Sequence, residues 1–99
     1  LSRAHLTGAL YSQEQTSMLP VLALQVASAH RLPGGPARQP PAPMRVLDLC
    51  AAPGSKTSQL GLWLASLGGG TLVANEPNHA RARTLRCNLL RAGLPGCLL

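Results

Sequence analysis

The sequence predicts an α/β fold built on one parallel βαβ unit with flanking helices. The apolar run at residues 45–49 is bounded by prolines, which is typical of a short buried strand. Residues 55–67 carry apolar side chains at helical spacing, and residues 71–75 form a second short apolar run. The order strand, glycine turn, helix, strand is that of a βαβ unit, so the two strands are expected to be parallel.

The chain before the first strand is predicted to be a helical lead-in over residues 1–32. Residues 1–11 indicate a loop or a weakly extended entry. Ser12, with Gln15 three residues later, matches a capping box, so a helix is predicted to begin at Gln13.

This first helix is predicted to bury one stripe of side chains. Leu19, Leu22 and Val26 are spaced at i, i+3 and i+7 and are expected to face the core. Pro20 lies inside this pattern, where proline either kinks a helix or restarts it as a first-turn residue.

Residues 33–44 are predicted to be an insertion loop rich in proline and glycine. Residues 33–43 hold five prolines and two glycines, a composition that disfavours a helix or a central strand. We expect a solvated surface loop. The alternative, a loop that contacts RNA through Arg31 and Arg38, stays open.

Two helices follow the first strand, over residues 55–67 and 78–92. Each has one apolar stripe that is expected to pack on the core. The first stripe is Leu60, Trp63, Leu64 and Leu67, and the second is Ala82, Leu85, Leu89 and Ala92. Glycines after each helix are suited to the left-handed backbone that ends it.

The turn after the first strand has the residue types of a ligand-binding loop. Ligands of open α/β sheets bind outside the carboxyl ends of the strands, where this turn lies. Gly54 lets the backbone approach a ligand closely, and Pro53 restrains the loop. Ala51 and Ala52 are small enough to leave room beside it. The free N–H groups at the start of the next helix attract negative charge, so they suit the carboxylate of an amino-acid-like ligand.

An acidic residue ends the second predicted strand. Glu76 lies twenty-two residues after Gly54, and an acid at this place typically accepts hydrogen bonds from two ribose hydroxyls. The turn and the acid together indicate a nucleoside-containing cofactor.

Two similar phosphate-binding loops are disfavoured. A P-loop needs a Gly-Lys-Ser/Thr run with a second glycine five residues before it, whereas Ser55 precedes Lys56 and Cys50 stands at the other glycine position. A dinucleotide fingerprint needs three glycines, and this turn and helix contain Gly54 and Gly61 alone.

The stretch 46–57 resembles the cofactor loop of the Sun (Fmu/RsmB-like) RNA cytosine-C5 methyltransferases. Residues 8–20 resemble the segment before that loop, and residues 74–78 and 81–93 resemble the next strand and helix. The blocks occur in the order found in the family. The resemblance implies the front half of a Rossmann-like methyltransferase fold, with residues 45–99 as a cofactor-binding βαβα segment truncated before the catalytic strands.

The resemblance also implies the cofactor and its contacts. The family uses S-adenosyl-L-methionine; its loop holds the methionine part and its acid holds the ribose. The residues implied in cofactor binding are Cys50, Ala51, Ala52, Pro53, Gly54, Ser55, Lys56 and Glu76.

Three side chains near the turn have competing interpretations. A cysteine beside a helix N-terminus can be activated as a thiolate, but the family takes its nucleophile from elsewhere, so Cys50 is expected to be a packed loop residue. Lys56 opposes the helix dipole, which favours contact with the cofactor carboxylate over a surface role. Asp48 is expected either to accept backbone N–H groups of the turn or to contact the cofactor through water.

The sequence departs from the family where catalysis is expected. The two catalytic cysteines of the family lie in later Thr-Cys and Pro-Cys blocks, and neither dipeptide occurs here. We therefore expect an incomplete domain that contains no catalytic residue and is inactive alone. The intact protein is expected to methylate C5 of cytosine in rRNA or tRNA. Three alternatives stay open: an inactive fragment that binds cofactor or RNA, a methyltransferase for another substrate, and a small complete domain.

Composition limits the partners and the cellular setting. The net charge of +6 suits RNA, although eight of the nine cations are arginine, which biased codon usage would also produce. The three cysteines form no C-x-x-C pair, so no metal is predicted, and no apolar run is long enough for a membrane span. An odd cysteine count without a signal peptide is typical of an intracellular protein. Nucleus, cytoplasm or organelle stays open, as does the oligomeric state.

Overall fold

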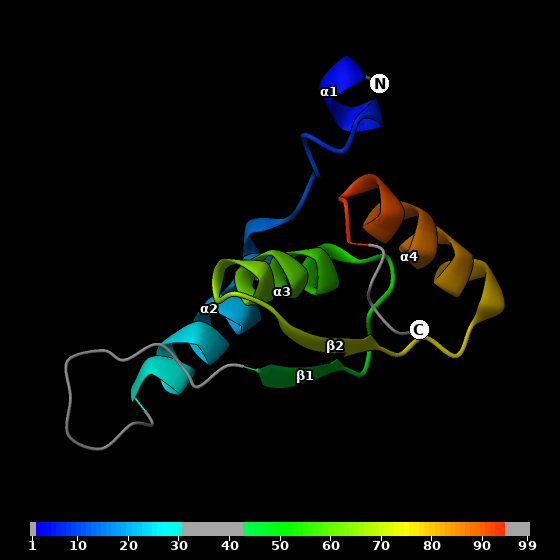
Figure 1. The fold of residues 1–99 in the computed structure, drawn as a ribbon. Coiled ribbons are helices and arrows are strands. Elements are labelled where there is room, and N and C mark those ends of the chain that lie inside the picture. Colours follow the sequence, from blue (N-terminus) through cyan, green and yellow to red (C-terminus); the bar gives the residue numbers. More distant parts are fainter. Residues whose placement is uncertain (1, 31–42, 95–99) are drawn as a thin grey trace.

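The computed structural model describes residues 2–30 and 43–94 (Figure 1). The elements are α1 (Arg3–Leu6), α2 (Gln15–His30), β1 (Met44–Asp48), α3 (Ser55–Ser66), β2 (Gly70–Ala74) and α4 (His79–Arg91). Within the described residues β1 and β2 form a two-stranded parallel sheet, in register from Met44 opposite Gly70 to Asp48 opposite Ala74. The predicted α/β class and the parallel βαβ unit are confirmed.

One side of the sheet is covered by two helices. α3 returns the chain from the end of β1 to the start of β2, and α2 packs beside α3 (Figure 1). The helices and strands share an apolar core of Val21, Leu60, Leu64 and Leu72, with Met44, Val46 and Trp63 packed against it. Each leucine buried in this core contributes roughly 1.5–3 kcal/mol by its removal from water.

A second apolar cluster lies at the carboxyl ends of the strands. There α4 packs against the turn after β1 and against the end of β2 (Figure 1). The cluster contains Ala51, Ala52, Ala74, Leu85 and Leu89, with Leu94 packed against it. The turn is therefore part of a core, and its shape depends on α4.

The N-terminal residues form a short helix where a loop or extended entry is predicted. α1 begins after Ser2, whose side chain accepts the His5 N–H (3.3 Å) and caps the helix. At its end, the Thr7 hydroxyl donates to the Arg3 carbonyl oxygen (3.0 Å). The prediction is wrong for residues 3–6, where a local cap starts a helical turn.

The predicted buried stripe of α2 is also wrong. Leu19, Leu22 and Val26 are 60%, 46% and 59% exposed, whereas Val21 is 2% exposed and belongs to the core shared with α3. The helix is apolar on several sides, so helical spacing alone does not identify the side that packs.

The remaining boundaries agree with the predictions to within one or two residues. Both strands begin one residue early, α3 ends one residue early and α4 is one residue shorter at each end. α2 begins at Gln15 rather than Gln13 and runs through Pro20. Of the predicted insertion loop, residues 33–42 lie outside the described residues, and Met44 is the first residue of β1.

Candidate functional site

The turn after β1 is braced by the last residue of that strand. The Asp48 carboxylate accepts the Cys50 N–H through Oδ1 (3.3 Å) and the Thr57 hydroxyl through Oδ2 (2.7 Å). Thr57 is fully buried in the first turn of α3, so the carboxylate connects the end of the strand to the start of the helix. Of the two roles considered for Asp48, support of the turn is the one observed.

Asn75 extends the strand pairing into the turn, a contact that the sequence-based prediction missed. Its N–H donates to the Asp48 carbonyl oxygen (2.8 Å), and its own carbonyl oxygen accepts the Ala51 N–H (3.1 Å). Its side-chain amide donates to the Leu49 carbonyl oxygen (3.0 Å). These bonds hold the turn against the end of β2. The one available sequence signal is an asparagine directly before the predicted ribose-binding acid.

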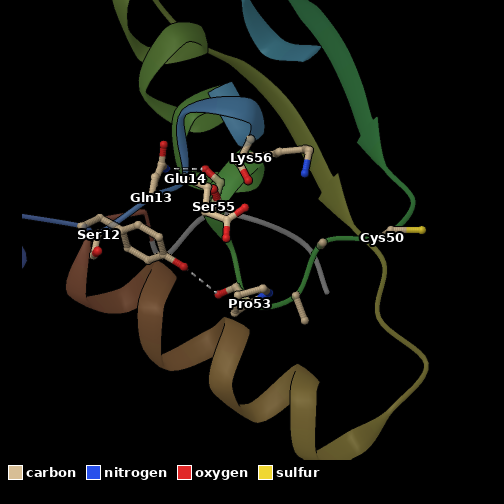
Figure 2. Close-up of a pocket in the computed structure, with 11 residues that line it drawn as sticks. Ser12, Gln13, Glu14, Cys50, Pro53, Ser55 and Lys56 are labelled. Carbon is tan, nitrogen blue, oxygen red and sulfur yellow. Dashed lines mark hydrogen bonds between the residues drawn. The ribbon is translucent and has the colours of Figure 1, made fainter. Parts of the chain in front are cut away.

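A pocket of about 230 Å³ opens between this turn and the segment before α2 (Figure 2). The N-terminal side of the pocket is lined by Tyr11, Ser12, Gln13, Glu14 and Ser17. The turn and the start of α3 contribute Cys50, Ala51, Ala52, Pro53, Ser55 and Lys56. The structure thus brings six of the eight predicted cofactor-binding residues together in one pocket, while Gly54 and Glu76 are not part of its lining.

Gly54 has a backbone conformation and a close neighbour that both require glycine. Its φ is +112°, a conformation that L side chains rarely adopt. A Cβ at this position would lie 3.2 Å from Leu85 Cδ1 and 3.7 Å from Asn88 Cβ. The glycine therefore makes room for α4, and its role in admitting a ligand stays a prediction.

The turn divides into buried and exposed residues. Ala51 and Ala52 are buried against α4, while Cys50 and Pro53 are exposed. The expectation that Cys50 is a packed loop residue is wrong. The chain turns outward once β1 has ended at Asp48, and it buries the two alanines instead.

The start of α3 presents polar groups to the pocket. The Ser55 hydroxyl oxygen is buried without a hydrogen-bond partner among the described residues, and a buried hydroxyl left in this state is costly. The first N–H groups of a helix have no acceptor within it and carry the positive end of its dipole. Lys56 also lines the pocket, so this part of the site suits an anionic group.

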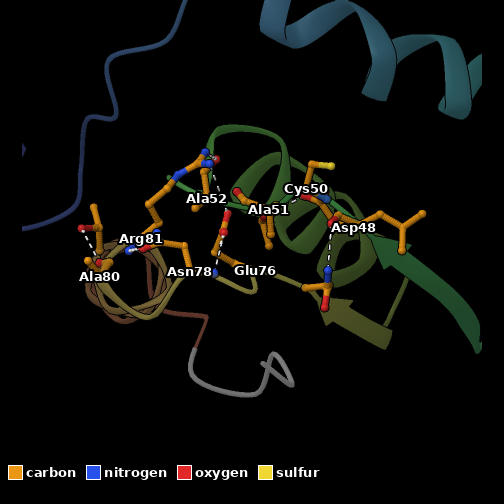
Figure 3. A network of polar contacts seen from close by, with 12 residues as sticks. Asp48, Cys50, Ala51, Ala52, Glu76, Asn78, Ala80 and Arg81 are labelled. Atoms are coloured by element: carbon orange, nitrogen blue, oxygen red, sulfur yellow. Dashed lines mark hydrogen bonds and ion pairs between the residues drawn. The ribbon is translucent and has the colours of Figure 1, made fainter.

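Glu76 lies two residues beyond the end of β2, and its side chain is 5% exposed. Its Oε1 accepts the Asn78 N–H (3.0 Å), and its Oε2 lies 3.8 Å from Arg81 Nη1. The same guanidinium donates through Nη2 to the Ala52 carbonyl oxygen (3.2 Å), so Arg81 links the acid to the turn (Figure 3). The sequence-based prediction did not include this contact of Arg81.

Two side chains from distant segments donate to the same carbonyl oxygen of the turn. The Asn88 amide nitrogen lies 2.7 Å and the Tyr11 hydroxyl oxygen 3.5 Å from the Pro53 carbonyl oxygen. Burial raises the pKa of Tyr11 above 10.0, partly opposed by the Arg91 guanidinium, so the phenol remains a donor at neutral pH. Neither side chain carries a sequence signal for this contact.

Within residues 2–30 and 43–94, no group of three or more His, Cys, Asp and Glu side chains is placed to hold a metal ion. In the same part of the chain, no helix is both long and apolar enough to cross a membrane.

Comparison with known proteins finds relatives along nearly the whole chain. Residues 38–98 match the family described as 16S rRNA methyltransferase RsmB/F. The ribosomal RNA small subunit methyltransferases F of Serratia proteamaculans and Salmonella paratyphi C are each 41% identical to this chain over 95 residues. These matches cover 96% of this chain and 17% of each relative.

The fold also matches that of a solved structure. The crystal structure of NSun6 from Pyrococcus horikoshii with SFG has a TM-score of 0.72 and 22% sequence identity to this chain. The match covers 99% of this chain and 22% of the NSun6 chain. The described elements therefore have the arrangement of part of a Rossmann-like methyltransferase fold.

Proposed function

Because the chain belongs to the RsmB/F family of 16S rRNA methyltransferases, we propose that it forms the S-adenosyl-L-methionine-binding part of an RNA (cytosine-5-)methyltransferase. The pocket between the turn and the segment before α2 is the observation that carries this proposal. It lies at the carboxyl end of a parallel strand, where open α/β sheets bind ligands. The names of the relatives favour small-subunit ribosomal RNA over transfer RNA as the substrate.

The proposed organisation of the chain follows from the pocket. Residues 45–99, together with Met44 at the start of β1, are proposed to be the cofactor-binding segment, with residues 33–43 as an insertion loop and residues 1–32 as the lead-in. The lead-in does more than precede the site, because its residues 11–14 line one side of the pocket.

The pocket suits the methionine part of the cofactor, which carries a carboxylate and an ammonium group. Lys56 and the first N–H groups of α3 are proposed to hold the carboxylate. Glu14, which lines the same pocket, is proposed to attract the ammonium group. The buried Ser55 hydroxyl would gain the hydrogen-bond partner that it lacks among the described residues.

Glu76 is proposed to hold the ribose. A carboxylate has about four lone-pair sites. One of them accepts the Asn78 N–H, and a second faces Arg81 at the longer distance of 3.8 Å. Capacity for two ribose hydroxyls remains, and the existing contacts keep the acid oriented.

When bound, the cofactor would supply an electrophilic methyl group. We propose that this chain binds the cofactor and orients its methyl group. We propose no catalytic residue within this chain. Cys50 is exposed beside the pocket, but no side chain of the described part hydrogen-bonds its thiol. The two catalytic cysteines of the family lie in a Thr-Cys block and a Pro-Cys block, and this sequence contains neither dipeptide.

Two measurements on the protein as it is naturally encoded test this proposal. Calorimetric titration with S-adenosyl-L-methionine should show binding that Glu76→Gln weakens. Arg83→Ala, which removes an exposed cation of α4, should leave the affinity unchanged. Incubation with methyl-labelled cofactor should then place 5-methylcytosine in 16S rRNA. Absence of cofactor binding would reject the proposal, and binding without methyl transfer to any RNA would favour an inactive binding fragment.

A further inference from the structure

One face of α4 holds the turn after β1. Arg81, Leu85 and Asn88 are spaced at i, i+4 and i+7, so their side chains follow one stripe of the helix. Arg81 donates to the Ala52 carbonyl oxygen (3.2 Å) and Asn88 donates to the Pro53 carbonyl oxygen (2.7 Å). Leu85, between them, is buried in the same cluster as Ala52. Successive turns of α4 therefore contact successive residues of the loop.

Arg91 determines which way the Asn88 amide points. Arg91 Nη2 donates to Asn88 Oδ1 (3.0 Å). A guanidinium has no acceptor, so the amide oxygen faces Arg91 and the amide nitrogen faces Pro53. Arg91 also donates through Nη1 to His5 Nε2 (3.1 Å). The donor to the turn is thus oriented by contacts that extend to α1.

The hydrogen bond from Asn88 to the Pro53 carbonyl oxygen also fixes the orientation of the next backbone N–H, that of Gly54. The peptide bond between Pro53 and Gly54 is not among the cis bonds of the described residues, and in a planar trans peptide the C=O and N–H groups point in opposite directions. Asn88 therefore sets the direction of the Gly54 N–H, immediately before α3. The first amides of that helix have no acceptor inside it, and they are the donors proposed to hold the cofactor carboxylate.

Arg81 joins the two parts of the proposed site. One nitrogen of its guanidinium donates to the Ala52 carbonyl oxygen, and the other lies 3.8 Å from Glu76 Oε2. Because the Arg81 side chain is 61% exposed, this ion pair adds little stability. Its consequence is geometric, since a planar guanidinium fixes the separation of the groups that it contacts.

We propose that Asn88 and Arg81 are positioning residues for cofactor binding. In this arrangement α4 sets the shape of the turn and the direction of its donors without touching the ligand. Gln13 supports the turn from the pocket side, where its amide donates to the Ser55 carbonyl oxygen (2.8 Å). The inference rests on the proposed cofactor site, but the control of the turn by α4 can be tested without any ligand.

Hydrogen–deuterium exchange of the unliganded, naturally encoded protein tests that control. Asn88→Ala and Arg81→Ala should each raise the exchange of residues 50–57 and leave β2 unchanged. Arg83→Ala is the matched control, because it removes an exposed arginine from another side of the same helix. A uniform increase in exchange across α3 and β2 would mean that these side chains stabilise the whole fold, and it would overturn the proposal. Unchanged exchange in residues 50–57 would also overturn it.

Titration of the same variants with S-adenosyl-L-methionine tests the consequence for binding. Loss of one orienting hydrogen bond predicts a dissociation constant about three- to tenfold higher for Asn88→Ala. Asn88→Asp keeps an acceptor for Arg91 but loses the donor to Pro53, so it should weaken binding at least as much. Faster exchange in the turn with unchanged affinity would overturn the positioning role. If the wild-type protein binds no cofactor, the proposed function fails, while the exchange result still decides whether α4 shapes the turn.

Discussion

Replacing Gly54 by alanine should destabilise the protein through two separable costs. At φ +112° a side chain strains the backbone, by about 1–2 kcal/mol for a left-handed residue. The added Cβ would also lie 3.2 Å from Leu85 Cδ1. Leu85 is fully buried, so it cannot move away freely, and overpacking of this kind costs about 1–3 kcal/mol. The expected sum, roughly 2–5 kcal/mol, is large against a typical folding free energy of about 5–15 kcal/mol.

Gly68 offers a matched control for the backbone cost. Its φ is +89°, and nothing lies within 4 Å of a Cβ built on it. Thermal unfolding of Gly68→Ala should therefore report the strain alone, and the additional loss in Gly54→Ala should report the contact with Leu85. Gly54→Val should be worse than Gly54→Ala in both stability and cofactor affinity. Equal losses of stability in Gly54→Ala and Gly68→Ala would show that the contact between the added Cβ and Leu85 is not tight. No loss of stability in Gly54→Ala would refute the geometry of the turn.

Three further predictions concern single side chains around the turn. Asp48→Asn should lower the free energy of unfolding by about 1–2 kcal/mol, because a carboxylate that accepts two hydrogen bonds is replaced by an amide with one acceptor oxygen. An unchanged free energy of unfolding in chemical denaturation would contradict this. Lys56→Ala should weaken cofactor binding less than Glu76→Gln, because it removes one proposed, partly exposed contact, whereas Glu76→Gln removes a proposed pair of ribose contacts. Calorimetry gives the ranking directly. The Tyr11 phenol should titrate above pH 10.0 in the folded protein. Since folding favours its neutral form, its contribution to stability is present below that pH and is lost as the pH rises through the raised pKa. A difference titration of wild type against Tyr11→Phe with a midpoint at or below 10.0 would count against the burial of this side chain.

The turn could be predicted from sequence because its signals are local. Pro53 and Gly54 interrupt an apolar run directly before a helical pattern, and that order defines a βαβ unit without any tertiary information. The predicted elements accordingly agree with the structure to within one or two residues. The role of Asp48 in bracing the turn was also accessible, because its partners lie two and nine residues away.

The packing of α2 could not be predicted in the same way. The helix carries apolar residues on several sides, including Leu19, Val21, Leu22 and Leu24. Periodicity identifies a stripe only when the other sides are polar. Val21 packs into the core, and the three leucines remain exposed. Which side of α2 is buried therefore depends on how the helix packs against α3 and the sheet.

The contacts that hold the turn from outside are equally invisible in the sequence. Asn88 and Pro53 are 35 residues apart, and Tyr11 and Pro53 are 42 apart. No local pattern specifies such pairs, since an asparagine in a helix is usually a surface residue. Cys50 illustrates a different error, because the resemblance to the family suggested a packed residue, whereas the direction of the chain after β1 exposes it.

The turn, the segment before α2 and Glu76 are together proposed to bind S-adenosyl-L-methionine. A crystal structure of the naturally encoded protein with this cofactor would test that proposal. The cofactor carboxylate should lie at the first amides of α3 beside Lys56, and the ribose hydroxyls should lie within hydrogen-bond distance of Glu76. A cofactor bound elsewhere, or a ribose that makes no contact with the Glu76 carboxylate, would contradict the proposed site.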